Sequence, residues 1–440
     1  MEISRTAISR RTLKICGLLY AIAQIFFLIN IQHPSTHNFD EFHYVPSAKQ
    51  LLDLRENQNW EHPPLGKELM AVGIGIVGDN PVGWRIMSTI FGALTLVGMF
   101  LWALAIFESE ATALWVAMLT LCNQLLYVQA RIGMLDTFMF AFLSFGLAAF
   151  TAAWKSKMPA LTSRKLFRFT GLMLGLATAC KWFGVIPWVT CMTLVGFVYF
   201  LKHQGVSFSD ASEQDWYSPK LFSGMRKRDW ILSFGLIPLT VYFMTYIPYY
   251  FVDGNNLGFW DLFTMQTKAY SGQLRVVNTH PYMSQWWDWP TLHRPIWYAY
   301  NTEGANKEWV RGVLLLGNPL IMWTGLLAIL VCALQWLFTR SKSAFMILAF
   351  YGAFFVCWMV IPRKISFYYY YYPAGMVLSF AIASTFDWLE SRFSKEFIPW
   401  VRWAYLGSSL GLFIYFFPIL AGLKIPAASF TNWMWFRSWI

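Results

Sequence analysis

The chain has 440 residues, of which 57% are hydrophobic and only 13% are charged, whereas soluble globular domains carry about 25% charged residues. This composition excludes a soluble globular protein, and apolar runs of helix length exclude a β-barrel, so we expect an all-α polytopic membrane protein. Cytoplasmic Lys and Arg that set membrane topology and meet anionic headgroups account for much of the net charge of +11. Membrane lipids, and no nucleic acid, are therefore the expected partners.

The first apolar segment follows a basic N-terminus. Arg10, Arg11 and Lys14 precede an apolar run over residues 16–31, and no small-residue cleavage site follows that run. We therefore expect an uncleaved first membrane helix with its N-terminus in the cytoplasm. Ten more apolar segments bring the expected membrane helices to eleven: 85–107, 111–128, 133–154, 169–181, 184–201, 230–250, 313–338, 344–361, 366–386 and 403–422.

Eleven crossings that start inside define the two sides of the protein. Each loop expected in the cytoplasm carries Lys or Arg, as the positive-inside rule requires: 155–168, 202–229, 339–343 and 387–402. One transmembrane domain, 1–422, then presents a first outer loop at 32–84, a second at 251–312 and a C-terminal four-helix part at 313–422, with an outward-facing tail at 423–440. All histidines except His203 fall in the outer segments, so we expect an outward-facing site.

The first outer loop is expected to contain two short helices in the membrane interface. An apolar stripe over 44–52 predicts the first, and Pro63-Pro64 suits the start of the second, over 65–77. Such helices would hold the neighbouring polar residues at the membrane boundary.

An acidic pair, Asp40 and Glu41, directly precedes these helices, and His43, His62 and Lys67 follow it. Adjacent carboxylates point in different directions, so we expect separate roles, and either one can serve as a general base. The alternative is a solvated acidic loop, which the nearby His62 and Lys67 disfavour.

Three ionisable residues lie close to the outer ends of membrane segments. Arg131 follows the third segment and Asp136 begins the fourth. Ionisable groups at such depth are costly and are usually functional or paired, so the alternatives are a role in the site and a structural Arg131–Asp136 ion pair. Lys181 can bind a phosphate or extend to the interface.

The later outer segments combine cations with aromatic residues. His280 and Arg294 flank Trp286-Trp287-Asp288-Trp289, a pattern that suits sugar faces or lipid headgroups and equally an interfacial aromatic belt. Arg363 and Lys364 precede the five tyrosines of 368–372. These two cations can face a phosphate or anchor the helix at the interface.

Motifs occur along the chain in this order: Asp40-Glu41, His62-Pro63-Pro64-Leu65-Gly66-Lys67, Leu316-Gly317-Asn318-Pro319, and Arg363 before the tyrosine run. In these motifs the chain resembles the protein O-mannosyltransferase family of the GT-C superfamily. The resemblance covers residues 38 to 375 and implies eleven transmembrane helices, a cytoplasmic N-terminus and an outward-facing site. It also implies inverting transfer of mannose from a polyprenyl phosphate to Ser/Thr hydroxyls of exported proteins, with no cofactor beyond the donor substrate. Metal use stays open, because His and carboxylates are available without a diagnostic spacing.

The resemblance also implies residue roles. Asp40 would be the base and Glu41 would position the acceptor or support the site. Donor phosphate and lipid would be bound by Arg131, Lys181, Arg363 and Lys364. Substrate-binding or supporting residues would be His43, His62, Lys67, Asp136, His280 and Arg294.

Two departures from the family pattern bear on the assignment. Only about sixty residues separate the seventh and eighth segments, too few for the β-trefoil domain of eukaryotic members, which fits a compact bacterial-type protein of the inner membrane. The tyrosine run also lacks the His that the family usually has near Tyr370. A GT-C transferase with a lipid or glycan acceptor, as in aminoarabinose transfer, is the main alternative. A flippase or transporter is disfavoured because no internal repeat is evident and the charges cluster on one side.

Overall fold

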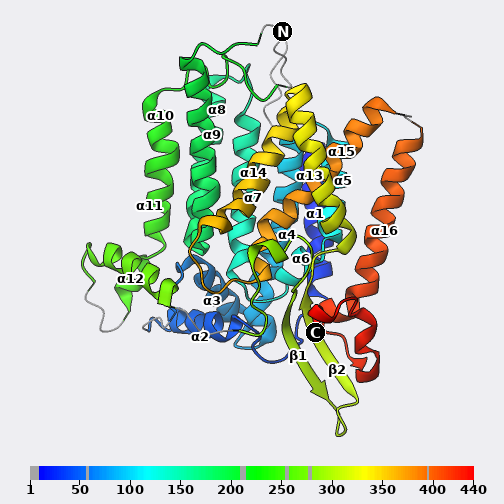
Figure 1. The fold of residues 1–440 in the computed structure, drawn as a ribbon. Coiled ribbons are helices and arrows are strands. Elements are labelled where there is room, and N and C mark those ends of the chain that lie inside the picture. The colour runs from blue at the N-terminus through cyan, green and yellow to red at the C-terminus, as the bar shows by residue number, and fades with distance from the viewer. Residues whose placement is uncertain (1–8, 56–58, 209–214, 253–256, 276–279, 394–395) are drawn as a thin grey trace.

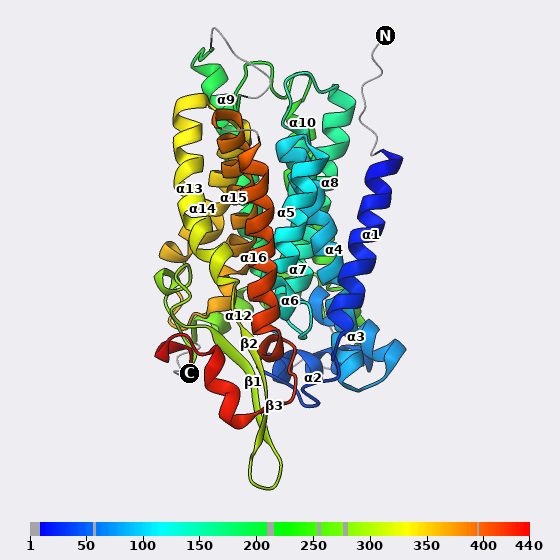
Figure 2. The same ribbon diagram turned by 90° about the vertical axis from the view of Figure 1, so that its right-hand side faces the viewer.

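The computed structural model describes residues 9–55, 59–208, 215–252, 257–275, 280–393 and 396–440 (Figure 1). Long helices run side by side along one axis and form a bundle, as Figure 2 shows from a second side. Eight segments in the described ranges are long and apolar enough to cross a membrane. They comprise α1 (Arg10–Leu28), α4 (Pro81–Phe107), α7 (Leu135–Ala153), α9 (Val185–His203), α10 with α11 (Lys227–Ile231 and Ile237–Met244), α13 (Pro319–Thr339), α14 (Lys342–Val360) and α16 (Phe397–Leu420).

The predicted class, an all-α polytopic membrane fold, is confirmed. The three other expected crossings also contain helices: α5 (Glu110–Cys122) with α6 (Gln124–Gln129), α8 (Ala160–Cys180) and α15 (Tyr372–Arg392). The count of eleven crossings stays a prediction, because α5 is short, and α8 and α15 carry charged residues near one end.

The centre of the bundle is formed by α4 and α7, whose apolar stretches are the most buried. Their close approach depends on Gly98 of α4, where an added Cβ would lie 1.9 Å from Ser144 Oγ on α7. Peripheral helices instead expose large apolar side chains, for example Phe338 on α13 and Trp400 on α16. Lipid-facing helices have this pattern, because hydrocarbon tails solvate such side chains as well as a protein core does.

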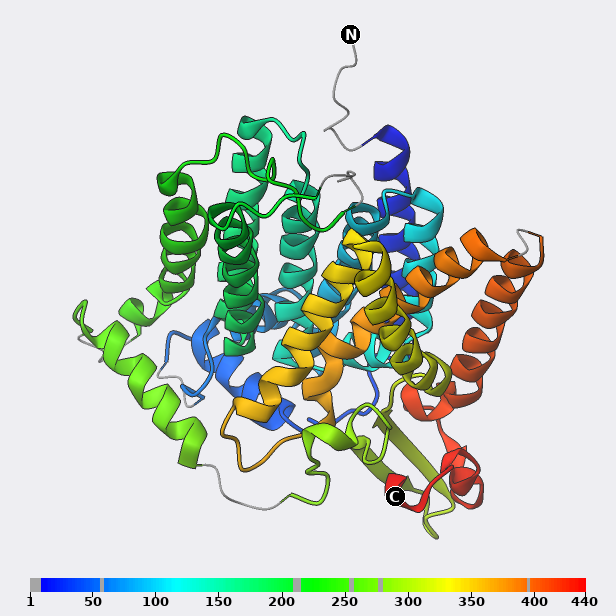
Figure 3. The same ribbon diagram turned by 45° about the horizontal axis from the view of Figure 1, so that its top comes forward.

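One end of the bundle carries most of the expected outer segments (Figures 1 and 3). The two short helices expected in the first outer loop are confirmed as α2 (Glu41–Leu52) and α3 (Leu65–Val77), and their location in the membrane interface stays a prediction. A third helix, α12 (Asp261–Arg275), and a β-hairpin accompany them. The start of α1 lies at the opposite end, as the expected sidedness requires, while the membrane side itself stays a prediction.

The hairpin joins β1 (Ile296–Glu303) and β2 (Trp309–Leu315), and β3 (Ile425–Pro426) pairs with the other edge of β2, giving the antiparallel order β1-β2-β3. The sequence-based boundary at 313 was wrong, because the strand continues to Leu315 and the next helix begins only at Pro319, after the capping residue Asn318. Similarly, α15 starts at Tyr372, after a 3₁₀ turn over Tyr368–Tyr371.

Candidate active site

The loop before α2 turns sharply at Phe39, whose φ of 51° lies in the left-handed region that non-glycine residues rarely adopt. Its ring packs against four other rings at centroid distances of 5.1 to 5.9 Å: those of His280, Tyr298, Phe367 and Tyr369. This aromatic packing compensates the unfavourable conformation and joins the first outer loop to the C-terminal half of the chain. Asp40, the next residue, is thereby fixed at their junction.

Asp40 is half-buried, and its two carboxylate oxygens have different surroundings. Oδ2 accepts hydrogen bonds from the hydroxyls of Tyr44 at 3.1 Å and Tyr369 at 3.4 Å. No described residue donates a hydrogen bond to Oδ1. Burial raises the pKa of the Asp40 carboxyl above its ordinary value, although the charge of Lys181 and the Tyr44 hydroxyl oppose the shift. The two tyrosine hydroxyls therefore hold the Asp40 carboxylate in place through Oδ2 and leave Oδ1 available to accept a proton.

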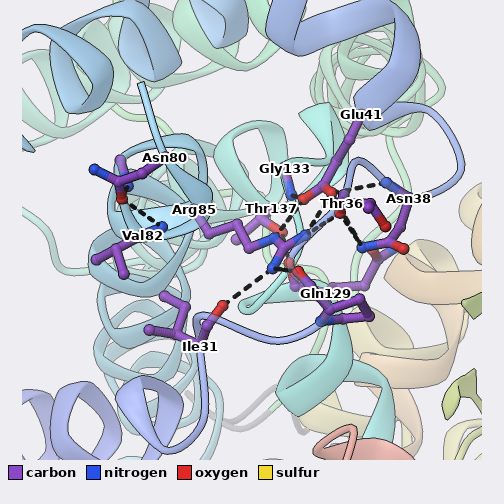
Figure 4. Close-up of polar contacts among 12 residues, drawn as sticks. Ile31, Thr36, Asn38, Glu41, Asn80, Val82, Arg85, Gln129, Gly133 and Thr137 are labelled. Carbon is purple, nitrogen blue, oxygen red and sulfur yellow. Dashed lines mark hydrogen bonds and ion pairs between the residues drawn. The ribbon is translucent and has the colours of Figure 1, made fainter. Parts of the chain in front are cut away.

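Glu41 has the opposite character, since its side chain is completely buried. Arg85 on α4 binds it with two hydrogen bonds of 2.8 Å, one to each carboxylate oxygen (Figure 4). The carboxylate also accepts from the backbone N–H groups of Gly133 at 2.8 Å and Asn38 at 3.0 Å. Both carboxylate oxygens of Glu41 thus accept hydrogen bonds from the protein itself. Of the two roles expected for Glu41, this geometry fits support of the site better than positioning of an acceptor.

Arg85, which forms a clamp with Glu41, also holds the loop between α1 and α2. Its remaining N–H groups donate to the carbonyls of Ile31 at 3.1 Å, Pro34 at 2.7 Å and Thr36 at 3.1 Å. Arg85 and Glu41 are thus a buried ion pair whose polar atoms are satisfied, the condition under which such a pair is tolerated. The clamp fixes the backbone on the N-terminal side of Asp40. Sequence reasoning missed Arg85, although an arginine at the first position of the apolar run 85–107 was a usable signal.

Asp136 pairs with Lys181, and the structural Arg131–Asp136 pair considered from the sequence is wrong. Lys181 Nζ lies 2.8 and 2.7 Å from the two Asp136 oxygens. The ammonium also lies over the rings of Tyr369 and Tyr370, at 4.7 and 5.2 Å from their centroids. This pair joins α7 and the end of α8 next to Asp40, and the buried Lys181 side chain does not extend to the protein surface.

Arg131 is held by backbone carbonyls. It donates to Phe27 at 3.3 Å, Ile29 at 2.6 Å and Leu420 at 3.2 Å, and its guanidinium lies 4.9 Å from the Tyr127 ring centroid. The side chain is buried between α1 and the end of α16. Because the hydrogen bonds of Arg131 join these helices, its geometry does not fit the expected binding of a donor phosphate.

Arg363 and His62 approach the same region from opposite ends of the chain, with Gln273 of α12 between them. Arg363 Nη2 donates to Gln273 Oε1 at 2.7 Å, and its guanidinium lies 5.0 Å from the Tyr370 ring centroid. Gln273 Nε2 lies 3.4 Å from His62 Nε2 and 3.1 Å from the Glu61 carbonyl. Burial lowers the pKa of His62 well below its ordinary value, with Lys181 and other cations acting in the same direction, so the imidazole is neutral at neutral pH.

The remaining predicted residues differ in their surroundings. Lys67 is buried and donates to the carbonyls of Asn59 and His62, so it holds the loop that carries His62. Lys364 and His43 are exposed. His280 packs on Phe39 and accepts from the backbone N–H of Tyr282 at 3.2 Å.

Arg294 connects the second outer loop to the C-terminal tail. It donates to the carbonyls of Ser438 at 2.6 Å, Ile440 at 2.9 Å and Pro281 at 3.0 Å. Of the two roles expected for Arg294, substrate binding and support, this geometry fits support. In the described ranges, no group of three or more His, Cys, Asp and Glu side chains is arranged to hold a metal ion.

The arrangement therefore brings Asp40, Lys181 and Arg363 together and leaves Arg131 and Arg294 outside. Sequence reasoning did not single out Tyr44 and Gln273 as members of the site. A carboxylate with a raised pKa beside a guanidinium and several tyrosines can remove a proton from a hydroxyl while a cation stabilises an anionic leaving group.

Two family models match adjacent parts of the chain. The model described as dolichyl-phosphate-mannose-protein mannosyltransferase matches residues 75–263, and the model of the C-terminal four TMM region of protein-O-mannosyltransferase matches residues 259–439. The polyprenol-phosphate-mannose–protein mannosyltransferase of Mycolicibacterium smegmatis is 26% identical, over 96% of this chain and 92% of its own. The protein of the same name from Corynebacterium glutamicum is 24% identical, over 99% of this chain and 94% of its own.

Solved structures with a similar fold are also transferases. The Saccharomyces cerevisiae protein O-mannosyltransferase Pmt1-Pmt2 complex bound to the sugar donor aligns with a TM-score of 0.80 at 15% identity, covering 99% of this chain and 93% of that chain. ArnT from Cupriavidus metallidurans bound to undecaprenyl phosphate aligns with a TM-score of 0.58 at 16% identity, covering 93% of this chain and 77% of that chain. The two alignments confirm the GT-C type of fold that the resemblance implied.

Proposed function

Because the chain belongs to the protein O-mannosyltransferase family, we propose that it transfers mannose, with inversion, from a polyprenyl-phosphate-mannose donor to Ser/Thr hydroxyls of exported proteins. The observation that carries the residue assignment is the environment of Asp40, whose Oδ2 is held by two tyrosine hydroxyls while Oδ1 is available. The start of α1 and the site lie at opposite ends of the bundle, which supports the proposed sidedness of a cytoplasmic N-terminus and an outward-facing site. The membrane that we propose for this enzyme is the bacterial inner membrane.

In the proposed reaction, the acceptor hydroxyl oxygen bonds to the anomeric carbon of mannose while the bond from that carbon to the phosphate oxygen breaks. The hydroxyl proton passes to Oδ1 of Asp40. The polyprenyl phosphate leaves with the bonding electron pair, and attack from the face opposite the phosphate inverts the anomeric centre. A phosphate is a good leaving group, so this chemistry needs a cation at the phosphate more than a general acid.

Arg363 is the cation best placed to bind the leaving phosphate. Its guanidinium is positioned by Gln273 and the Tyr370 ring, and no acidic side chain in the described ranges forms an ion pair with it. Lys181, in contrast, is neutralised by Asp136. We assign Lys181 and Asp136 a supporting role, in which they position the tyrosine rings and contribute to the electrostatic potential at Asp40.

The pH dependence of kcat/KM tests the state of Asp40. The base must be ionised, and burial raises its pKa, so activity should fall with decreasing pH at a value above the ordinary Asp range of about 4. Tyr44→Phe removes a hydrogen bond that favours the ionised form. In this variant, the pH at which kcat/KM falls on the acidic side should rise by roughly 0.5 to 1 pH unit. An unchanged acidic limb in the Tyr44→Phe variant would contradict the assignment of Asp40 as the titrating group.

A pair of adjacent cations tests the phosphate site. Arg363→Gln should raise the donor KM about tenfold or more, because a hydrogen bond to a charged group contributes about 1.5–3 kcal/mol. Lys364→Gln is the matched control, since it removes one positive charge from the exposed neighbour and should change the donor KM much less. Equal increases of the donor KM in the two variants would show that the two cations act only through the overall positive potential of the region.

The function itself is tested by incubating the purified enzyme with polyprenyl-phosphate-mannose and a Ser/Thr-containing peptide from an exported protein, and then measuring the product mass. A gain of one hexose on the peptide is expected. Labelling of a lipid or glycan acceptor without labelling of the peptide would instead support the alternative acceptor class.

A further inference from the structure

The β-hairpin extends beyond the end of the helical bundle (Figures 1 and 2). Among the described residues, a third strand pairs with β2 and none pairs with the outer edge of β1. The strand order β1-β2-β3 makes β1 an edge strand. The C-terminal tail pairs with β2 through β3 and also packs on side chains of β1, where the Phe430 ring lies 4.9 Å from the Tyr300 ring, whereas α2 lies beside β1 in Figure 1. In that view the free edge of β1 faces α2, the helix that follows Asp40.

The register shows which main-chain groups of the hairpin are already used. The Glu308 carbonyl accepts from Ala427 N–H, on the β3 side of β2. Main-chain groups of successive strand residues point to opposite sides, so Arg311, three residues later, points toward β1. Its register partner on β1 is Asn301, which is therefore hydrogen-bonded to β2.

By the same alternation, Tyr300 and Thr302 direct their N–H and C=O groups to the free edge. Both residues are exposed, and no hydrogen bond joins their main-chain groups to any other part of the described chain. A row of unpaired main-chain groups on an edge strand is a template for the addition of another strand.

The same strand leads directly to the candidate active site. Tyr298, two residues before Tyr300, is buried, and its ring lies 5.1 Å from the ring of Phe39. Asp40 is the residue after Phe39. An extended chain advances about 3.3 Å per residue, so a peptide paired with the exposed edge reaches the region of Asp40 within a few residues.

We propose that the acceptor polypeptide docks as an extended strand along the free edge of β1, with main-chain hydrogen bonds to Tyr300 and Thr302, and that this docking presents its Ser or Thr to Asp40. The proposal rests on the proposed function, since it specifies how that acceptor binds. Main-chain pairing supplies affinity without reading side chains, so segments of different sequence could dock in the same way. It also selects unfolded or extended segments, because a folded substrate has no free main-chain groups to offer.

Thr302→Pro tests this docking from the enzyme side. Proline removes the outward N–H, and edge strands tolerate it where the N–H does not serve the ladder. The acceptor KM should rise about three- to tenfold, the value of one main-chain hydrogen bond, with the donor KM unchanged. Thr302→Val, which keeps the amide and the β-branched shape, is the matched control and should behave as the wild type. An acceptor KM that is equal in the two variants overturns the proposal.

Acceptor peptides with a single N-methylated amide test it from the substrate side, on the wild-type enzyme. On one side of the acceptor Ser, methylation at every second position should raise the acceptor KM, and the positions between should tolerate it. Absence of this alternation overturns the docking mode, even if Thr302→Pro unfolds the hairpin. Absence of any transfer to the unmethylated peptide would contradict the proposed function instead, so the two failures are distinguishable.

Discussion

Asp40→Asn is expected to lower kcat by about 10²- to 10⁴-fold, the usual contribution of a general base. An amide keeps the size of the carboxylate and can still accept hydrogen bonds from the Tyr44 and Tyr369 hydroxyls. It cannot take the proton of the acceptor hydroxyl. Transfer of labelled mannose to a Ser peptide measures the loss, and donor binding, measured separately by thermal shift, should stay close to that of the wild type.

Glu41→Gln is the matched control for this variant, because it makes the same change of atoms one residue away. Glu41 accepts hydrogen bonds from Arg85, Gly133 and Asn38, so its substitution should lower stability. The fraction that remains folded should keep a kcat close to that of the wild type. A folded but inactive Glu41→Gln variant, beside an active Asp40→Asn variant, would exchange the roles of the two carboxylates.

The sequence was sufficient to predict the helical class and the two short helices after Asp40, because each depends on local periodicity. Partners across the fold were not predictable. Asp136 pairs with Lys181, 45 residues away, and not with Arg131, which is much closer in sequence. That choice depends on how α7 and α8 pack, which no single segment encodes.

The second outer loop shows the same limit in another form. Its aromatic residues are typical of an interfacial belt, so the sequence did not predict a hairpin there. In the structure, Trp297 and Tyr298 are buried residues of a β-strand. A bulge between Trp297 and Ala299 interrupts the two-residue alternation by which a strand is recognised. Gln273 was missed for a related reason, because its importance comes only from lying between Arg363 and His62.

Arg85→Met should destabilise the folded protein by about 3–5 kcal/mol, the cost of leaving a buried charge without its partner. The substitution leaves the Glu41 carboxylate buried and removes the donors that hold the carbonyls of Ile31, Pro34 and Thr36. Thermal unfolding in detergent or nanodiscs measures the loss. The ion pair Arg11–Glu110, with an N–O distance of 2.9 Å and an exposed arginine, provides the control, and Arg11→Met should have little effect because solvent screens surface charges.

The double variant Arg85→Met with Glu41→Met separates the charge pair from the other contacts of Arg85. If the unpaired carboxylate causes most of the loss, removing it should restore part of the stability, since apolar residues of similar volume can replace a buried ion pair. Activity should not return in the same measure, because Asp40 depends on the loop that the clamp holds in place. If the stability losses of the two single variants simply add in the double variant, Arg85 and Glu41 act independently. The position of Asp40 would then be set mainly by the aromatic packing of Phe39.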